Sequence, residues 1–187
     1  MKKVLSLLLL TVLLLTGCFD TPKEMNRALS LRTKLLQASS CSFDAEITAD
    51  YGDKLYTFGM ACTADDKGDV TFRVTAPDSI SGITGQISRE GGALTFDDTA
   101  LQFNLLADDQ LSPVSAPWVL MKTLRGGYIT GAGLEDGLLR LSINDSYEDD
   151  ALNLDIWLDS EDVPEKAEIC YDGKRILSIR VENMVIS

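Results

Sequence analysis

Short runs of alternating apolar and polar residues are the feature that most narrows the folds open to this chain. Between Cys41 and Ala49 every second residue is apolar, and the same alternation returns from residue 56 to residue 62. A period of two places successive side chains on opposite faces of a β-strand. Turn-forming Asp and Gly residues separate these runs, so the sequence predicts a mainly antiparallel β fold.

Two helices are expected to interrupt the strands. The first covers residues 23–38 and carries a broad apolar stripe. The second covers residues 118–125, follows Pro117 and is apolar on nearly every side, so we expect it over or within an apolar cleft. Further strands are predicted at residues 69–76, 83–89, 93–97, 101–105, 138–144, 151–159, 166–171 and 175–186, and the glycines of 126–133 are interpreted as loop and turn residues.

The predicted fold class is mainly β (α+β). A single curled antiparallel sheet, with an N-terminal helix and a short helix covering its concave face, accounts for this order of elements, because one face of such a sheet must find apolar cover.

The N-terminus has the three-part layout of an export signal. Lys2 and Lys3 precede an apolar run of roughly a dozen residues, which is shorter than the about 20 residues that a membrane-spanning helix needs. The run ends in Leu-Thr-Gly-Cys at residues 15–18, which resembles the lipobox of bacterial lipoproteins. This resemblance implies a signal peptide at 1–17, diacylglyceryl attachment to Cys18 and a lipidated tether at 18–24. The alternative is an incidental thiol at Cys18 within a plain signal peptide.

The predicted location is therefore the extracytoplasmic face of the cell membrane, through the lipid anchor. Removal of residues 1–17 changes the formal charge from −12 to −14, because two lysines are lost. Such an acidic surface repels phosphate backbones, so nucleic acid is not expected as a partner. For the same reason we expect the body to stand away from an anionic bilayer.

Histidine is absent from the sequence, which removes histidine-dependent nucleophiles, general bases and metal sites. Adjacent acidic residues occur at 65–66, 97–98, 108–109 and 148–150, where we interpret them as solvated turn charges, with calcium binding at 145–150 as a weaker alternative. We expect no catalytic residue, no metal site and no cofactor, and hence a protein that is not an enzyme.

The first hairpin contains two cysteines. If Ala49 pairs with Lys54, the register places Cys41 opposite Cys62 on the same apolar face. A disulfide between them and two buried free thiols are both compatible with the sequence. Cys170 has no evident mate.

Several short motifs resemble the LolA-like superfamily of lipoprotein carriers and lipid-binding proteins. They are Asp-Ile-Trp-Leu-Asp at 155–159, Val-Pro-Glu-Lys at 163–166, the last strand near Asn183, and a strand followed by proline at 72–77. The resemblance implies an unclosed β-barrel over residues 25–187, with helices covering its concave face and an apolar cavity for acyl chains. The soluble carrier of that superfamily keeps no lipid, so Cys18 departs from it.

Two functions follow as expectations. The first is a membrane-anchored lipoprotein that binds a lipid or a lipoprotein acyl chain in an apolar cavity. The second is a non-catalytic interaction module that uses the same scaffold with a filled core and binds an envelope protein or a second copy of itself. The residues expected to line the cavity would equally form a packed core. They are Phe43, Phe58, Phe72, Phe96, Trp118, Met121 and Ile156.

Overall fold

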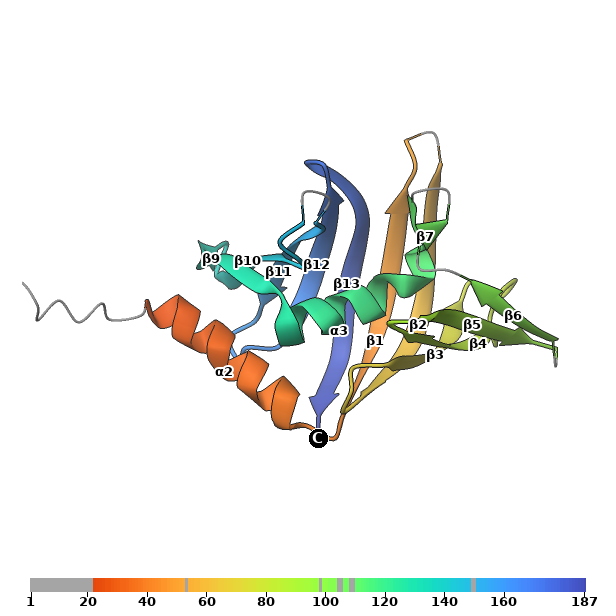
Figure 1. The fold of residues 1–187 in the computed structure, drawn as a ribbon, viewed down its shortest axis with the longest axis horizontal. Helices are drawn as coiled ribbons and strands as arrows, with labels where there is room; N and C mark the ends of the chain where they lie inside the picture. Colours follow the sequence, from red (N-terminus) through yellow and green to blue (C-terminus); the bar gives the residue numbers. More distant parts are fainter. Residues whose placement is uncertain (1–21, 53, 98, 104–105, 108–109, 149–150) are drawn as a thin grey trace, which may run out of the picture.

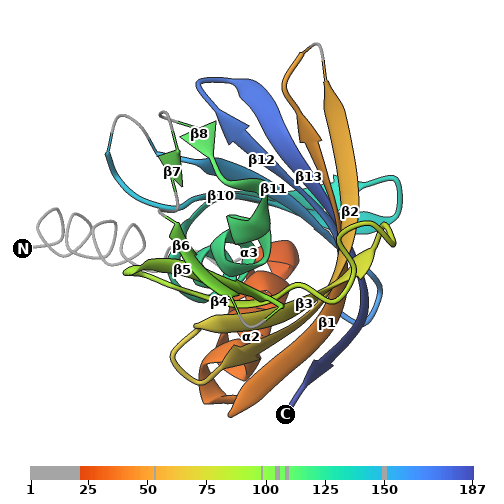
Figure 2. The same ribbon diagram turned by 90° about the vertical axis from the view of Figure 1, so that its right-hand side faces the viewer.

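The computed structural model describes residues 22–52, 54–97, 99–103, 106–107, 110–148 and 151–187. Eleven strands form one antiparallel sheet in the order β6-β5-β4-β3-β2-β1-β13-β12-β11-β10-β9. Its outer strands β6 and β9 do not pair with each other, so the sheet curls without closing (Figure 2). This architecture confirms the predicted fold class.

The elements follow the order expected from the sequence, with three additional strands, β7, β8 and β9. The helical segments are α2 (Lys23–Gln37), the 3-10 turn η1 (Pro113–Ser115) and α3 (Ala116–Gly126). The strands before α3 are β1 (Ser40–Asp50), β2 (Leu55–Asp65), β3 (Val70–Ala76), β4 (Thr84–Ser88), β5 (Gly91–Phe96), β6 (Thr99–Phe103), β7 (Leu106–Ala107) and β8 (Gln110–Leu111). The strands after α3 are β9 (Tyr128–Glu135), β10 (Leu138–Asn144), β11 (Asn153–Leu158), β12 (Pro164–Tyr171) and β13 (Lys174–Ile186).

Helix α3 crosses the concave face of the sheet (Figures 1 and 2). It contacts β2, β10 and β13, which come from both halves of the sheet. Because the helix is apolar on nearly every side, most of its surface can be buried against strands or against α2, and Lys122 is the side chain left exposed. Its buried residues are Ala116, Pro117, Trp118, Val119, Leu120, Met121, Thr123 and Leu124.

Two arginines tie the ends of α2 and α3 together. Arg32 donates from Nε to the carbonyl oxygen of Leu124 at 2.8 Å, and Arg125 donates to the carbonyl oxygen of Leu35 at 2.9 Å. The last carbonyls of a helix have no partner within the helix and carry partial negative charge. Each guanidinium therefore caps the C-terminal turn of the other helix, which fixes the crossing of the two helices.

The predicted register of the first hairpin was wrong by two residues. Ala49 pairs with Tyr56 instead of Lys54, and Cys62 lies opposite Phe43 instead of Cys41. The turn is centred one residue later than expected, with Gly52 in the left-handed region at φ +84°. A shift of two keeps every side chain on its expected face, so the alternation alone could not exclude it.

Strand β9 was also missed by the sequence analysis. Gly131 and Gly133, interpreted as loop glycines, lie within this strand opposite Ser142 and Arg140 of β10. Because β9 is an edge strand with small residues on one face, it lacks the alternation of bulky apolar side chains that marked the other strands.

Truncation of a core residue on α3 tests the packing of this helix. We expect Leu120→Ala to lower the free energy of unfolding by about 2–5 kcal/mol, because Leu120 is fully buried and its removal leaves a cavity. Leu55→Ala, at a position 66% exposed, should change it by less than about 1 kcal/mol. Urea denaturation measures both, and equal effects of the two substitutions would contradict the central position of α3.

Candidate functional site

The residues predicted to line an apolar cavity divide into two groups. Phe43, Phe72, Trp118, Met121 and Ile156 belong to one buried cluster, and half-buried Phe58 packs against it. Phe96 differs from them, because 50% of its surface is exposed. The first six therefore take part in the packing between the sheet and α3, whereas Phe96 keeps exposed apolar surface.

Phe96 belongs to an apolar surface on the inner face of β5 and β6. Leu94 pairs with Leu101 across the two strands and with Gly85 of β4, which pairs in turn with buried Phe72. Paired residues share a face, and residues two positions apart on a strand share it too. We name this surface the β5–β6 shelf; it consists of Leu94, Phe96, Leu101 and Phe103.

The inner half of the shelf joins the core and the outer half is open. Leu94 and Phe103 are half-buried and pack against the buried cluster. Leu101 is 64% exposed, although it lies on the same face. Strand β6 is an edge of the eleven-stranded sheet, so among the described residues no further strand of this sheet flanks the shelf on that side. The sequence analysis did not single out Leu101, although its alternation with Gln102 carried the signal.

Two glycines make room for aromatic rings on this face. A side chain at Gly85 would meet the ring of Phe72 at 2.5 Å, and one at Gly92 would overlap the ring of Phe103. The rings therefore lie flat over the backbone of β4 and β5. The inner face of β4 and β5 is therefore lined by aromatic rings that pack directly on the glycine backbone.

A groove of about 550 Å³ lies on the opposite, outer face of β2–β5. Thr71 and Arg73 line it and alternate along β3 with the buried Val70, Phe72 and Val74, which face the core. Threonine, glutamine and arginine side chains give this groove a polar surface. Among the predicted cavity residues Phe72 alone is part of its wall, so the groove does not correspond to the expected acyl-chain site.

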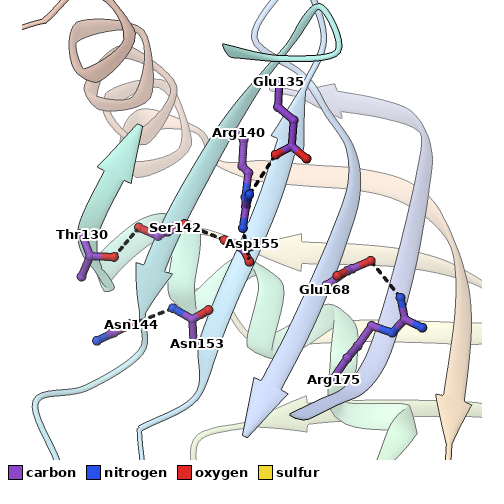
Figure 3. A network of polar contacts seen from close by, with 9 residues as sticks. All are labelled: Thr130, Glu135, Arg140, Ser142, Asn144, Asn153, Asp155, Glu168 and Arg175. Atoms are coloured by element: carbon purple, nitrogen blue, oxygen red, sulfur yellow. Dashed lines mark hydrogen bonds and ion pairs between the residues drawn. The ribbon is translucent and has the colours of Figure 1, made fainter. Parts of the chain in front are cut away.

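The outer face of the C-terminal half carries a polar network (Figure 3). Arg140 forms ion pairs with Asp155 at 2.8 Å and with Glu135 at 2.9 Å, and Ser142 donates to Asp155 at 2.6 Å. Burial raises the pKa of Asp155, but the hydrogen bonds from Arg140 and Ser142 outweigh it, so the pKa lies below its usual value. These contacts join β9, β10 and β11, which gives the network a structural role.

Arg140 also lies over the ring of Trp157, 5.4 Å from its centre, and Lys166 lies over it at 4.0 Å. Trp157 is the tryptophan of the motif that carried the family resemblance. Trp157 is itself buried, but it alternates along β11 with the core-cluster residues Leu154, Ile156 and Leu158, so its side chain lies on the opposite face of the sheet from α3. The aromatic ring therefore stabilises the outer face through cation–π contacts rather than lining a cavity.

The three cysteines within the described residues are free thiols. Cys41 lies opposite Ala64, so Cys41 and Cys62 are diagonal neighbours. Diagonal neighbours are about 7–8 Å apart, longer than the Cβ separation of about 3.5–4.5 Å in a disulfide. Burial raises the pKa of Cys41 to about 11 and that of Cys62 to about 12. The predicted bridge thus loses its geometric basis, and the alternative of two buried thiols describes the structure. The predicted lipidation site Cys18 lies outside the described residues.

Several acidic residues of the turns accept hydrogen bonds from the backbone. Asp65 accepts from the amides of Lys67 and Asp69, both at 2.9 Å. Asp145, at the start of the segment considered for calcium, accepts from the amide of Leu152 at 2.8 Å and pairs with Lys122 at 3.0 Å. Across the described part of the chain, no group of three or more Cys, Asp or Glu residues is placed to hold a metal ion.

No described helix combines the length and the apolar character that crossing a bilayer requires.

Comparison with known proteins gives matches at the level of structure. No family model matches the sequence, and no curated protein matches it. A LolA superfamily protein from Nitrosomonas europaea is similar with a TM-score of 0.46 at 9% identity, over 86% of this chain and 93% of that one. Lipoprotein LppX from Mycobacterium tuberculosis is similar with a TM-score of 0.40 at 12% identity, over 86% and 92%. LprF from Mycobacterium bovis is similar with a TM-score of 0.40 at 11% identity, over 88% and 93%. At these identities the likeness concerns the fold alone.

Thiol labelling tests the state of the cysteines. In the mature chain without Cys18, we expect half-buried Cys170 to react first with a thiol reagent at pH 8. Cys41 and Cys62 should react only after unfolding, because burial and a raised pKa suppress their thiolates. Cys170→Ser should abolish labelling of the native protein. A mass lower by two hydrogen atoms and unreactive Cys41 and Cys62 in denaturant would instead show the disulfide.

The polar network should make stability depend on pH. A carboxyl whose pKa is lowered in the folded state stabilises the protein above its unfolded value, about 3.9 for Asp, and this contribution is lost as pH falls through the lower folded value. We therefore expect Asp155→Asn to destabilise the protein at pH 7, with a difference from wild type that shrinks below about pH 4. Urea unfolding across pH measures this. Exposed Asp78→Asn is the control, and a pH-independent effect at Asp155 would contradict the role of the ion pair.

Proposed function

We propose that this protein is an envelope lipoprotein, anchored through a lipid on Cys18 at the extracytoplasmic face of the membrane, that binds the acyl chain of a lipid or lipoprotein on the inner face of its sheet. The observation that carries the proposal is the β5–β6 shelf. Its outer residues Phe96 and Leu101 are apolar, lie on the face that elsewhere forms the core, and are 50% and 64% exposed.

Burial of the shelf under an acyl chain is favourable because apolar surface is removed from water, at about 25 cal/mol per Å². An acyl chain needs no hydrogen-bond partners along its length, and the shelf offers side chains of the same kind. The half-buried Leu94 and Phe103 continue this surface inward to the cluster around α3. The shelf therefore provides a path from the open edge of the sheet towards the core residues predicted from the sequence.

The chemistry of the chain favours binding over catalysis. Histidine is absent from the sequence. The described ionisable residue nearest in sequence to the shelf is Asp97, which follows Phe96 in the turn between β5 and β6 rather than lying within either strand. In this proposal the binding domain comprises residues 25–187, residues 18–24 form the tether, and residues 1–17 are the signal peptide that export removes.

A second function is favoured by a different observation. The apolar residues of α3 are buried and fill the concave face with the protein's own side chains, as expected of an interaction module with a packed core. Under this alternative the shelf binds an apolar segment of another envelope protein or of a second copy, and no lipid accompanies the purified protein.

Lipid analysis of matched variants separates the two functions. The mature chain after Cys18, purified from a bacterial envelope, should carry an acyl species in near-stoichiometric amount, detected by native mass spectrometry and lipid extraction. Phe96→Glu and Leu101→Glu should lose it, because a carboxylate on the shelf opposes burial under an apolar chain. Both positions are exposed, so the variants should fold normally.

Val185→Glu is the matched control, because Val185 is 55% exposed on β13 and lies outside the shelf. It should retain the acyl species. A wild-type protein that is empty and indifferent to added lipid would sink the lipid-binding proposal and leave the interaction module. Equal loss from all three variants would show that the shelf is not the binding surface.

A further inference from the structure

The outward flank of α2 is apolar although no described element covers it. Leu29 is 44% exposed and Leu36 is 55% exposed. They are seven residues apart, which is two helical turns, so they lie one above the other on the same flank, with half-buried Met25 one turn before Leu29. The residues that α2 buries in the core, Ala28, Leu31 and Leu35, form a separate stripe. We name Met25, Leu29 and Leu36 the α2 flank.

The α2 flank lies close to the proposed lipid anchor along the chain. Helix α2 begins at Lys23, inside the segment 18–24 that the sequence assigned to the tether. Five steps of chain therefore join Cys18 to the helix, and a fully extended chain spans at most about 3.6 Å per residue. The first turn of α2 cannot lie farther than about 18 Å from the lipidated residue, and Leu29 follows six residues later at about 1.5 Å per residue.

The charge of α2 also differs from that of the rest of the molecule. It contains four basic residues and one acidic residue, a formal charge of +3 in a mature chain of −14. Arg27 is paired with Asp162 at 2.7 Å, and Arg32 is held by the end of α3. Lys23 and Lys34 are exposed. An anionic membrane surface would therefore repel most of this body while tolerating the helix nearest the anchor.

We propose that the α2 flank rests on the lipid bilayer, with Leu29 and Leu36 inserted at the headgroup boundary and the rest of the acidic body directed away from it. The proposal rests on the lipid anchor of the proposed function. A single helix with apolar residues on its outward flank binds a membrane surface weakly on its own, and a covalent lipid supplies the second signal. The contact would replace free rotation about the tether by one orientation of the sheet.

Side-chain footprinting on the acylated, full mature protein tests this contact. The protein is placed in vesicles of phosphatidylethanolamine and phosphatidylglycerol and oxidised with hydroxyl radicals, and each residue is read by mass spectrometry. Relative to the unacylated chain with the same vesicles, we expect a several-fold loss of oxidation at Leu29 and Leu36. Leu55, at the distant tip of the β1–β2 hairpin, should keep its reactivity (Figure 1).

A variant with about 20 flexible Gly and Ser residues inserted before Pro22 distinguishes contact from simple shielding by the vesicle. With this longer tether, Leu29→Gln together with Leu36→Gln should release the domain from the surface, whereas Val185→Gln should not. Equal oxidation of Leu29 and Leu36 in the acylated and unacylated proteins would overturn the proposal. So would protection that requires no vesicles and rises with protein concentration, since this would identify a second copy as the occupant.

The mass of the purified protein distinguishes failure of the lipid anchor from failure of the bilayer contact. A missing diacylglyceryl mass on Cys18 would contradict the anchor, and the bilayer contact would fall with it. Correct acylation with fully reactive leucines would contradict the bilayer contact alone and leave the proposed lipid-binding shelf to its own test.

Discussion

The burial of α3 inside the curled sheet is the interaction on which the rest of the structure depends. A sheet whose edges stay unpaired does not form a closed barrel, so its concave apolar face must be covered by another element. A helix that is apolar on nearly every side can provide this cover. Leu120 and Met121 are fully buried on adjacent positions of α3, which an amphipathic surface helix does not achieve. The same helix that completes the core therefore occupies the space in which a ligand would otherwise lie.

The position of this helix determines which apolar surface stays open. The contacts of α3 are with β2, β10 and β13, and the reciprocal arginine caps hold its end against α2. Strands β5 and β6 extend past the helix towards the edge of the sheet (Figure 1). The side chains of Phe96 and Leu101 consequently point to the same face of the sheet as the core residues, but α3 does not pack over them. The shelf is thus a consequence of a short helix covering a wide sheet.

Most of the fold could be predicted because alternation, turn residues and one all-apolar helix are local signals. The features that could not be predicted are those that depend on which strands pair with one another in the folded chain. The two registers of the first hairpin differ by two residues, so both bring Ala45 and Ile47 to the apolar face, and only the position of the turn decides between them. Strand β9 needs no bulky apolar side chains on the face where Gly131 lies, because Gly131 and Gly133 lie opposite Ser142 and Arg140 of β10 on the polar outer face of the sheet. Tertiary pairing forms the strand without a local signal.

The candidate site was predicted in part for the same reason. The residue types were those of an apolar ligand surface, but sequence cannot say which apolar residues an adjacent helix covers. Trp118 and Phe96 were placed in one group, and the structure separates them by the burial of the first and the exposure of the second. The central claim that follows is that α3 is permanent core while the shelf receives the ligand.

Hydrogen–deuterium exchange of the mature chain, with and without a long-chain acyl phospholipid, tests this claim most directly. The account predicts that the amides of α3 are among the slowest to exchange and are unchanged by lipid, while those of β5 and β6 become slower when lipid binds. Faster exchange in α3 upon lipid addition, with no change in β5 and β6, would contradict it, because the acyl chain would then enter beneath a helix that moves away.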